Sequence, residues 1–166
     1  MASAEFSART YGTGFFPDTY SRPRIDLRTQ EEVERDLWIG ERSERRIASI
    51  LSEIQIGGIR IVRDIIRYGK ASWEDYEKTD MTVFFADGSP IECVDVQSKS
   101  GPTGENLFIE EMAKDMRRKR IRGITPENWM AMNGIILLNG RKSRIQIEKD
   151  FKQQLVNVLH FRSTAA

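Results

Sequence analysis

The chain has very few of the residues that metal and nucleophile chemistry most often use. Its 166 residues include one cysteine, Cys93, and one histidine, His160. A single thiol cannot form an internal disulfide, and this inventory is too small for a zinc site or for Ser-His or Cys-His catalysis. We therefore expect a protein of a reducing compartment whose chemistry depends on other side chains.

Long apolar stretches are also missing. The sequence has no run of about 18 apolar residues that would span a membrane, and its N-terminal residues lack the apolar core of a signal peptide. The sequence therefore predicts a cytoplasmic protein that stays out of the membrane.

Neither sign of charge is in excess. The chain has 26 Lys and Arg against 25 Asp and Glu, for a net charge of +1, and 39% of its residues are hydrophobic. This composition is typical of a globular protein and neither favours nor excludes nucleic acid as a partner. The length indicates one domain over residues 29–166, preceded by an extended arm, residues 1–28, that shows no hydrophobic period.

Hydrophobic patterns predict seven elements in the order α-β-β-β-α-β-α. Thr29, followed by acidic residues, is a plausible N-cap for the first helix, and a pause of this helix at Gly40 is left open. The remaining elements are bounded by Gly- and Pro-rich turns. We expect helices over 29–55, 105–121 and 147–159, and strands over 59–68, 79–85, 91–97 and 130–139.

Polar residues gather at one end of the hairpin formed by the strands 79–85 and 91–97. Asp80 begins its first strand, and Gln97 and Lys99 end its second strand. Because neighbouring antiparallel strands place these positions at the same edge of the sheet, the three side chains should converge. An acid, an amide oxygen and an ammonium group in this arrangement favour a hard divalent cation beside a phosphate, which indicates a nuclease.

This order of elements and residues resembles the PD-(D/E)XK nuclease superfamily, over roughly residues 40–139. The resemblance implies an αβββαβ restriction-endonuclease-like core, a mixed central sheet flanked by helices, here with an added C-terminal helix. Asp80 matches the acid of the family motif, Gln97 stands in the place of its D/E, and Lys99 matches its lysine. Glu44 matches the glutamate that many members carry on the first helix. The pattern is most similar to archaeal Holliday-junction resolvases and virus-type replication-repair nucleases.

The resemblance implies a Mg²⁺ cofactor, with Mn²⁺ as a substitute, held by Glu44, Asp80, Gln97 and the main-chain carbonyl of Ser98. Lys99 would orient the attacking water, help to deprotonate it or stabilise the developing charge. Gln97 departs from the family pattern, because a neutral amide binds Mg²⁺ less well than a carboxylate and cannot act as a base. Asp95, on the same face of the strand, is a substitute for the missing charge. Two alternatives stay open: an active variant, or a site that has lost its metal.

A basic run, Arg117, Arg118, Lys119, Arg120 and Arg122, ends the predicted helix over 105–121. It either complements the helix dipole or contacts nucleic-acid phosphates. We expect DNA, branched DNA included, as the partner, and a homodimer by analogy with the resolvases. The main alternative is an inactive nuclease-fold protein that binds nucleic acid or serves in an assembly.

Each candidate also has a plain structural explanation. Acids and lysines at strand ends are common on protein surfaces, and Glu44 has potential i, i+4 partners on its own helix. Glu41, Asp64 and Asp75 are rival acids. A third hypothesis is therefore a protein-interaction domain in which the apparent motif is a coincidence.

Overall fold

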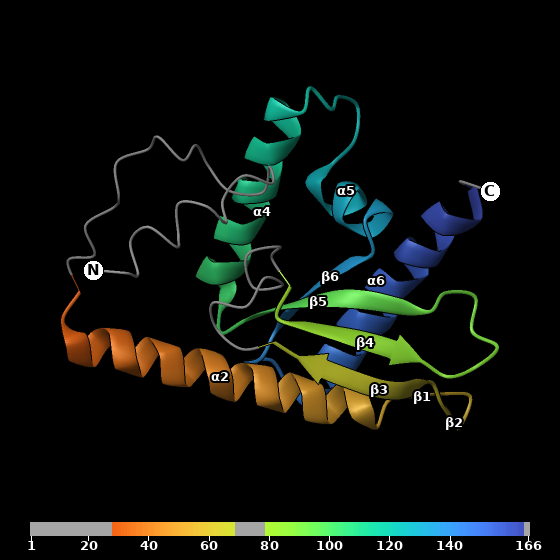
Figure 1. Cartoon of the computed structure of the whole chain (residues 1–166), viewed down its shortest axis with the longest axis horizontal. Coiled ribbons are helices and arrows are strands. Elements are labelled where there is room, and N and C mark those ends of the chain that lie inside the picture. The colour runs from red at the N-terminus through yellow and green to blue at the C-terminus, as the bar shows by residue number, and fades with distance from the viewer. Residues whose placement is uncertain (1–27, 69–78, 165–166) are drawn as a thin grey trace.

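The fold, seen in a computed structural model that describes residues 28–68 and 79–164, is an α/β arrangement around a mixed four-stranded sheet (Figure 1). The sheet order is β3-β4-β5-β6, in which β3, β4 and β5 pair antiparallel and β5 and β6 pair parallel. These strands are β3 (Val62–Arg67), β4 (Met81–Phe85), β5 (Cys93–Lys99) and β6 (Ile135–Asn139). The predicted α/β class with a mixed sheet is confirmed. The predicted arm over residues 1–28 lies outside the described residues except for Arg28.

Helices cover the two faces of this sheet. One core cluster joins helix α2 (Gln30–Ser52) and helix α6 (Arg144–Thr164) to a face that includes Met81, Val83 and Val96. A second cluster joins helix α4 (Pro102–Arg118) and helix α5 (Pro126–Met132) to Ile135 and Leu137 on the opposite face. Alternate residues of each strand therefore enter different clusters, as a two-sided sheet requires. In the described part of the chain, no helix has the length and apolar character needed to cross a membrane.

Helix α2 begins where the sequence indicates. The Thr29 side chain accepts a hydrogen bond from the Glu32 amide, and the Glu32 carboxylate accepts one from the Thr29 amide, which forms a capping box. The helix continues through Gly40 without the pause that was left open. Its apolar stripe, which includes Ile47, Ile50 and Leu51, is buried against the sheet. This stripe fixes which side of α2 faces the strands.

The segment after α2 differs from the single predicted strand over 59–68. Strands β1 (Gln55–Ile56) and β2 (Ile59–Arg60) form a separate two-stranded hairpin before β3 begins. Gly57 and Gly58 form its two-residue turn with φ values of 59° and 78°, a conformation that glycine adopts without strain. A register shift between Val62 and Asp64 then interrupts the pairing of β3 with β4. These breaks explain the imperfect alternation of the sequence.

The expectation of a strand from residue 130 was wrong for its first five residues, because α5 continues to Met132 and β6 begins only at Ile135. Thr125 accepts a hydrogen bond from the Asn128 amide and caps the short helix α5, with Pro126 in its first turn. Gly134, with a φ of 68°, follows the helix and leads into β6. Helices α4 and α6 likewise begin three residues earlier than predicted.

Both edges of the sheet carry side chains that bond its outer backbone groups. At β6, the Gln154 side chain of α6 donates to the Leu137 carbonyl and accepts from the Leu137 amide, both at 2.8 Å. At β3, the Asp64 carboxylate accepts from the Ile65 amide at 2.8 Å. A side chain therefore takes the position of a neighbouring strand at one residue of each edge.

We predict that Gln154→Leu lowers the free energy of unfolding by about 1–3 kcal/mol, because the buried amide and carbonyl of Leu137 would lose their partner. Urea unfolding followed by circular dichroism measures this change. Gln153→Leu, an exposed position on the same helix, is the matched control and should change stability by less than about 0.5 kcal/mol. Equal effects of the two substitutions would contradict a role for the Gln154 amide.

Candidate nuclease site

Four strands begin or end on the same side of the sheet. This row of strand ends, as distinct from the outer strands β3 and β6, is the edge at which the candidate site lies. Strand β3 ends at Arg67, β4 begins after Asp80, and β5 and β6 end at Lys99 and Asn139. The Tyr68 amide donates to the Asp80 carbonyl, and the Asp80 amide donates to the Val96 carbonyl. The backbone ladder therefore continues through Asp80. This edge brings together the residues that the hairpin pattern indicated.

Asp80 is held against the end of β5. Its side chain is buried, and its Oδ2 atom accepts a hydrogen bond from the Ser98 amide at 2.7 Å. A buried carboxylate needs such donors because burial removes the water that would otherwise solvate its charge. The bond also fixes the direction of the carboxylate relative to β5.

Gln97 lies opposite Asp80 when the register of β4 with β5 is continued by one residue, and its side chain has an unusual environment. It is only 6% exposed, and among the residues that the structure describes its Oε1 atom has no hydrogen-bond partner. Within the same residues the Ser98 hydroxyl also lacks a partner, and Ser98 is paired in register with Leu138 of β6. A buried oxygen without a donor costs roughly 1–3 kcal/mol, so native proteins usually provide a partner or a ligand.

Lys99 projects onto the face of the sheet that α4 covers. Its Nζ atom lies 5.3 Å from the centre of the Phe108 ring, within the range of a cation–π contact. Its aliphatic stem packs beside Gly104 in the first turns of α4. The ammonium group is thereby held close to the end of its own strand. Gln97 and Asp95, which alternate with buried valines along β5, lie on the same face.

Glu44 reaches this edge from α2. It is 5% exposed, and its Oε2 atom lies 3.7 Å from the Nη2 atom of Arg67 at the end of β3. The neighbouring Ser43 and Arg46 hold this part of α2 against the loop after β6, because Arg46 donates to the carbonyls of Gly140 and Lys142. The helix therefore presents Glu44 at the edge where Asp80 lies.

Gly140 links α2 to β5. Its amide donates to the Lys99 carbonyl at 2.7 Å, and a Cβ atom added to it would lie 2.6–3.0 Å from atoms of Ser43. Only glycine permits this approach. The position of α2, and with it Glu44, is thus set against the strand that carries Lys99.

Asp95 lies farther along the sheet. It is two residues before Gln97, about 6.6 Å along an ideal strand. Its Oδ1 atom accepts a hydrogen bond from Thr82 at 2.8 Å, and the Thr82 and Tyr68 hydroxyls are also hydrogen-bonded at 2.8 Å. Burial raises the pKa of the Asp95 carboxyl above its ordinary value of 3.8, against the opposing effect of the Thr82 bond. Asp95 is therefore part of a separate polar chain on the α4 side of the sheet.

Within residues 28–68 and 79–164, no three Asp, Glu, His or Cys side chains are close enough together to hold a metal ion. The candidate set has two carboxylates, Glu44 and Asp80, and supplements them with neutral oxygens. The orphaned Oε1 atom of Gln97 is the observation that fits a role for this set in binding a hard cation, since such cations prefer oxygen ligands. The rival acid Asp64 accepts from its neighbour's amide in β3, and Asp75 lies outside the described residues.

The basic run lies at the other end of α4. Its residues, Arg117, Arg118, Lys119, Arg120 and Arg122, are exposed, and Lys119 pairs with the buried Asp115 at 2.9 Å. Helix α4 has 17 residues, so its two ends are about 25 Å apart. Figure 1 shows α4 rising from the Lys99 end of β5 toward the turn that leads to α5. The basic run is therefore distant from the candidate site.

Sequence reasoning did not single out Arg67, Gly140, Ser43 or Arg46. These four residues belong to three segments that are far apart in the chain, and only the docking of α2 on the sheet brings them together. The Gly140 that follows an apolar strand was visible in the sequence, but strand-ending glycines are too common to indicate a close helix contact.

We predict that Gly140→Ala lowers the free energy of unfolding by about 1–3 kcal/mol, because the added methyl group would overlap Ser43. Ser43→Gly removes the overlapping Cβ and Oγ atoms at its own cost in helix stability. The double variant should therefore be more stable than the sum of the two single effects. Strict additivity in a urea-unfolding cycle would show that this contact does not constrain α2.

We also predict a pH-dependent effect of Asp95→Asn. Because the folded-state pKa of Asp95 is raised, its contribution to stability is greatest below the ordinary value of 3.8 and is lost as pH rises through the folded pKa. Asparagine does not ionise, so the melting temperature of the variant relative to wild type should be higher at neutral pH than at acidic pH. Asp87→Asn, in an exposed turn, is the control. A pH-independent difference for Asp95→Asn would contradict the raised pKa.

Comparison with known proteins gives no match. No family model matches the chain, and neither a curated protein nor a solved structure matches it significantly. The site described above is therefore assigned from the residues and contacts of this chain.

Proposed function

We propose that this chain is a metal-dependent nuclease with a restriction-endonuclease-like core that hydrolyses DNA phosphodiester bonds. The observation that carries the proposal is the buried Asp80 carboxylate, bonded to the Ser98 amide next to the unpartnered Oε1 atom of Gln97. Lys99 and Glu44 lie at the same end of the strands, Lys99 on the face that α4 covers and Glu44 on α2, which covers the opposite face. We place the cation and the phosphate just beyond the strand ends, where side chains from both faces would converge.

The residues of this edge have distinct parts in the proposed reaction. A Mg²⁺ or Mn²⁺ ion bound there would lower the pKa of a water molecule and neutralise charge on the phosphate in the transition state. Glu44, Asp80, Gln97 and the Ser98 carbonyl are the residues that would hold it. The Lys99 ammonium, steadied over the Phe108 ring, would orient the attacking water or stabilise the developing charge.

The distance between the basic run and this edge indicates which phosphates of a bound DNA the basic run would contact. About 25 Å corresponds to roughly seven base pairs of duplex. Contacts from Arg117, Arg118, Lys119, Arg120 and Arg122 would thus reach phosphates far from the scissile bond. Such contacts add affinity independent of base sequence, as cutting of DNA by its structure, branched forms included, would require. A homodimer, as in resolvases, would supply two such sites.

One feature favours a second candidate function. Gln97 occupies the position where an acid would provide the charge that holds the metal. A chain that lost this acid would keep the fold and its nucleic-acid contacts as an inactive binding or assembly subunit. Gln97→Glu separates the two functions, because it restores the carboxylate at a buried position that already lacks a partner.

We predict that wild-type protein cuts at least one DNA in a panel of linear, single-stranded, flapped and four-way substrates with Mg²⁺ or Mn²⁺. Asp80→Asn, which keeps an acceptor for the Ser98 amide, and Lys99→Ala should each lower the rate by at least about 100-fold. Asp87→Asn, an exposed acid at the other end of β4, is the matched control and should cut like wild type.

The other outcomes of this experiment are equally clear. An inert wild type whose Gln97→Glu variant cuts DNA would support the inactive-subunit function. Cutting that persists in both Asp80→Asn and Lys99→Ala would rule out this edge as the active site. If neither wild type nor Gln97→Glu cuts or binds Mn²⁺, the nuclease proposal fails.

A further inference from the structure

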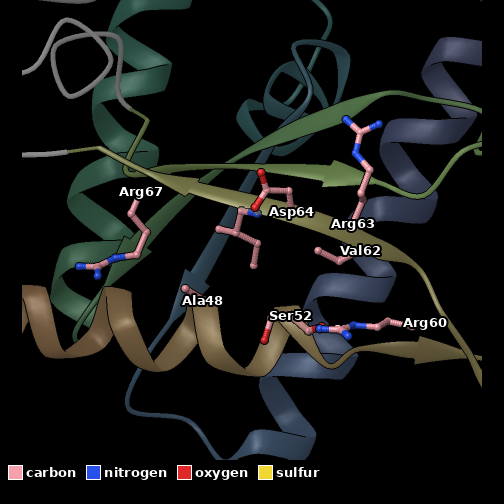
Figure 2. A pocket seen from close by; sticks show the side chains of 8 residues that line it. Ala48, Ser52, Arg60, Val62, Arg63, Asp64 and Arg67 are labelled. Atoms are coloured by element: carbon pink, nitrogen blue, oxygen red, sulfur yellow. Dashed lines mark hydrogen bonds between the residues drawn. The ribbon is translucent and has the colours of Figure 1, made fainter.

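A groove runs between helix α2 and the edge strand β3. Its volume is about 340 Å³, and Figure 2 shows the side chains along it. Ala48 and Ser52 line it from α2, and Val62 and Ile65 contribute apolar surface from β3. One end of the groove lies at Arg67, the residue that pairs with Glu44. The groove, called here the α2/β3 groove, therefore opens onto the candidate site.

Two arginines mark this groove at its ends. The Arg60 Nε atom donates to the Ser52 carbonyl at 2.6 Å, which fixes the side chain along α2. In the described part of the chain, Arg60 has no acidic partner within ion-pair distance. Arg67 directs its guanidinium toward α2, as Figure 2 shows, and a third of its side chain is exposed. Both cations keep donors that an anionic ligand would reach.

The other charged residues of β3 point differently. Figure 2 shows Arg63 and Asp64 on the side of the strand away from α2. Arg63 lies 6.0 Å from the Phe84 ring and 3.4 Å from the Asp87 carboxylate, and the Asp64 carboxylate is bonded to the Ile65 amide. Both Arg63 and Asp64 also line the groove, so its charged lining consists of three arginines and one carboxylate, and its net charge is positive.

The dimensions suit one extended strand of nucleic acid. Arg60 and Arg67 are seven residues apart, at most about 23 Å along a fully extended chain. The register shift between Val62 and Asp64 shortens this span, so the groove of about 340 Å³ takes a short stretch of one strand. Arg60 also lines a neighbouring hollow of about 380 Å³ with Glu53, Gln55 and Arg144. A space between one helix and one strand is too narrow for a duplex. Between the two terminal cations, the partly buried Ala48 and Ile65 provide apolar surface for the sugars of a single strand.

We propose that the α2/β3 groove binds the phosphates of a single-stranded DNA segment and leads that segment to the edge where Glu44, Asp80 and Lys99 lie. This inference rests on the proposed nuclease function and names its substrate class as duplexes with a single-stranded tail or flap. Arg67 connects the two places, since its guanidinium lines the groove and lies 3.7 Å from Glu44. Arg60 lines the groove but contacts none of the candidate site residues that the structure describes, so a change at Arg60 tests the groove separately from the site.

The test is fluorescence anisotropy of labelled DNA in EDTA, where no cutting occurs. The ligands are a blunt duplex and the same duplex with a single-stranded tail, and the proteins are wild type, Arg60→Gln, Arg60→Lys and Arg35→Gln. Arg35 is an exposed arginine in the N-terminal half of α2 and matches the charge change outside the groove. Circular dichroism checks that each variant is folded.

We expect wild type to bind the tailed duplex more tightly than the blunt one. Arg60→Gln should weaken binding of the tailed duplex about three- to tenfold and lower the slope of log K against log salt by about 0.7, the loss of one phosphate contact. Arg60→Lys should keep the wild-type slope because it keeps the charge. Arg35→Gln should bind like wild type.

Several results would overturn the inference. Equal binding of tailed and blunt DNA would refute the assignment of single-stranded DNA as the ligand. Unchanged binding of the tailed duplex by Arg60→Gln would refute the role of the α2/β3 groove in binding. Competition by an acidic peptide as strong as that of an oligonucleotide of equal charge would show a different occupant. If cutting still depends on Asp80 in these cases, the nuclease proposal stands alone; if wild type neither binds nor cuts any DNA, both proposals fail.

Discussion

The parallel pairing of β5 with β6 is the constraint on which the arrangement of this molecule depends. Two parallel neighbours cannot be joined by a tight turn, so the chain crosses over through α4 and α5 before it forms β6. The crossover covers one face of the sheet and places the ends of both strands at the same edge. Lys99 and Gly140 become neighbours for this reason, and their backbone hydrogen bond gives α2 a fixed place to dock.

Local patterns were enough to predict the parts of the fold that depend on nearby residues. The Thr29 cap, the apolar stripe from Ile47 and the hairpin that joins β4 to β5 follow from side chains within a few residues of one another. The break in β3 and the helix α5 did not follow, because in those segments cap and turn residues compete with short apolar runs. A helical turn forms there because Thr125 and Pro126 begin helix α5, and Gly134 ends the turn that follows it.

The candidate site shows the same division. Asp80 and Ser98 are brought together by hairpin register, which can be read from the spacing of two strands. The pairing of Glu44 with Arg67 depends on the docking of α2, which no local pattern describes. The direction of α4 likewise decides that the basic residues after Met116 lie far from Lys99. Sequence spacing alone could not distinguish this placement from one beside the site.

The side chains that bond the outer strands have a consequence for how copies of this chain can associate. Exposed strand edges are the usual template for intermolecular pairing, and aggregation often begins there. Gln154 already fills the hydrogen-bonding positions of Leu137, and Asp64 takes the amide of Ile65 beside a register shift. A second copy would have to displace these groups before it could extend the sheet. Extension of the sheet by another strand is therefore opposed at Leu137 of β6 and at Ile65 of β3.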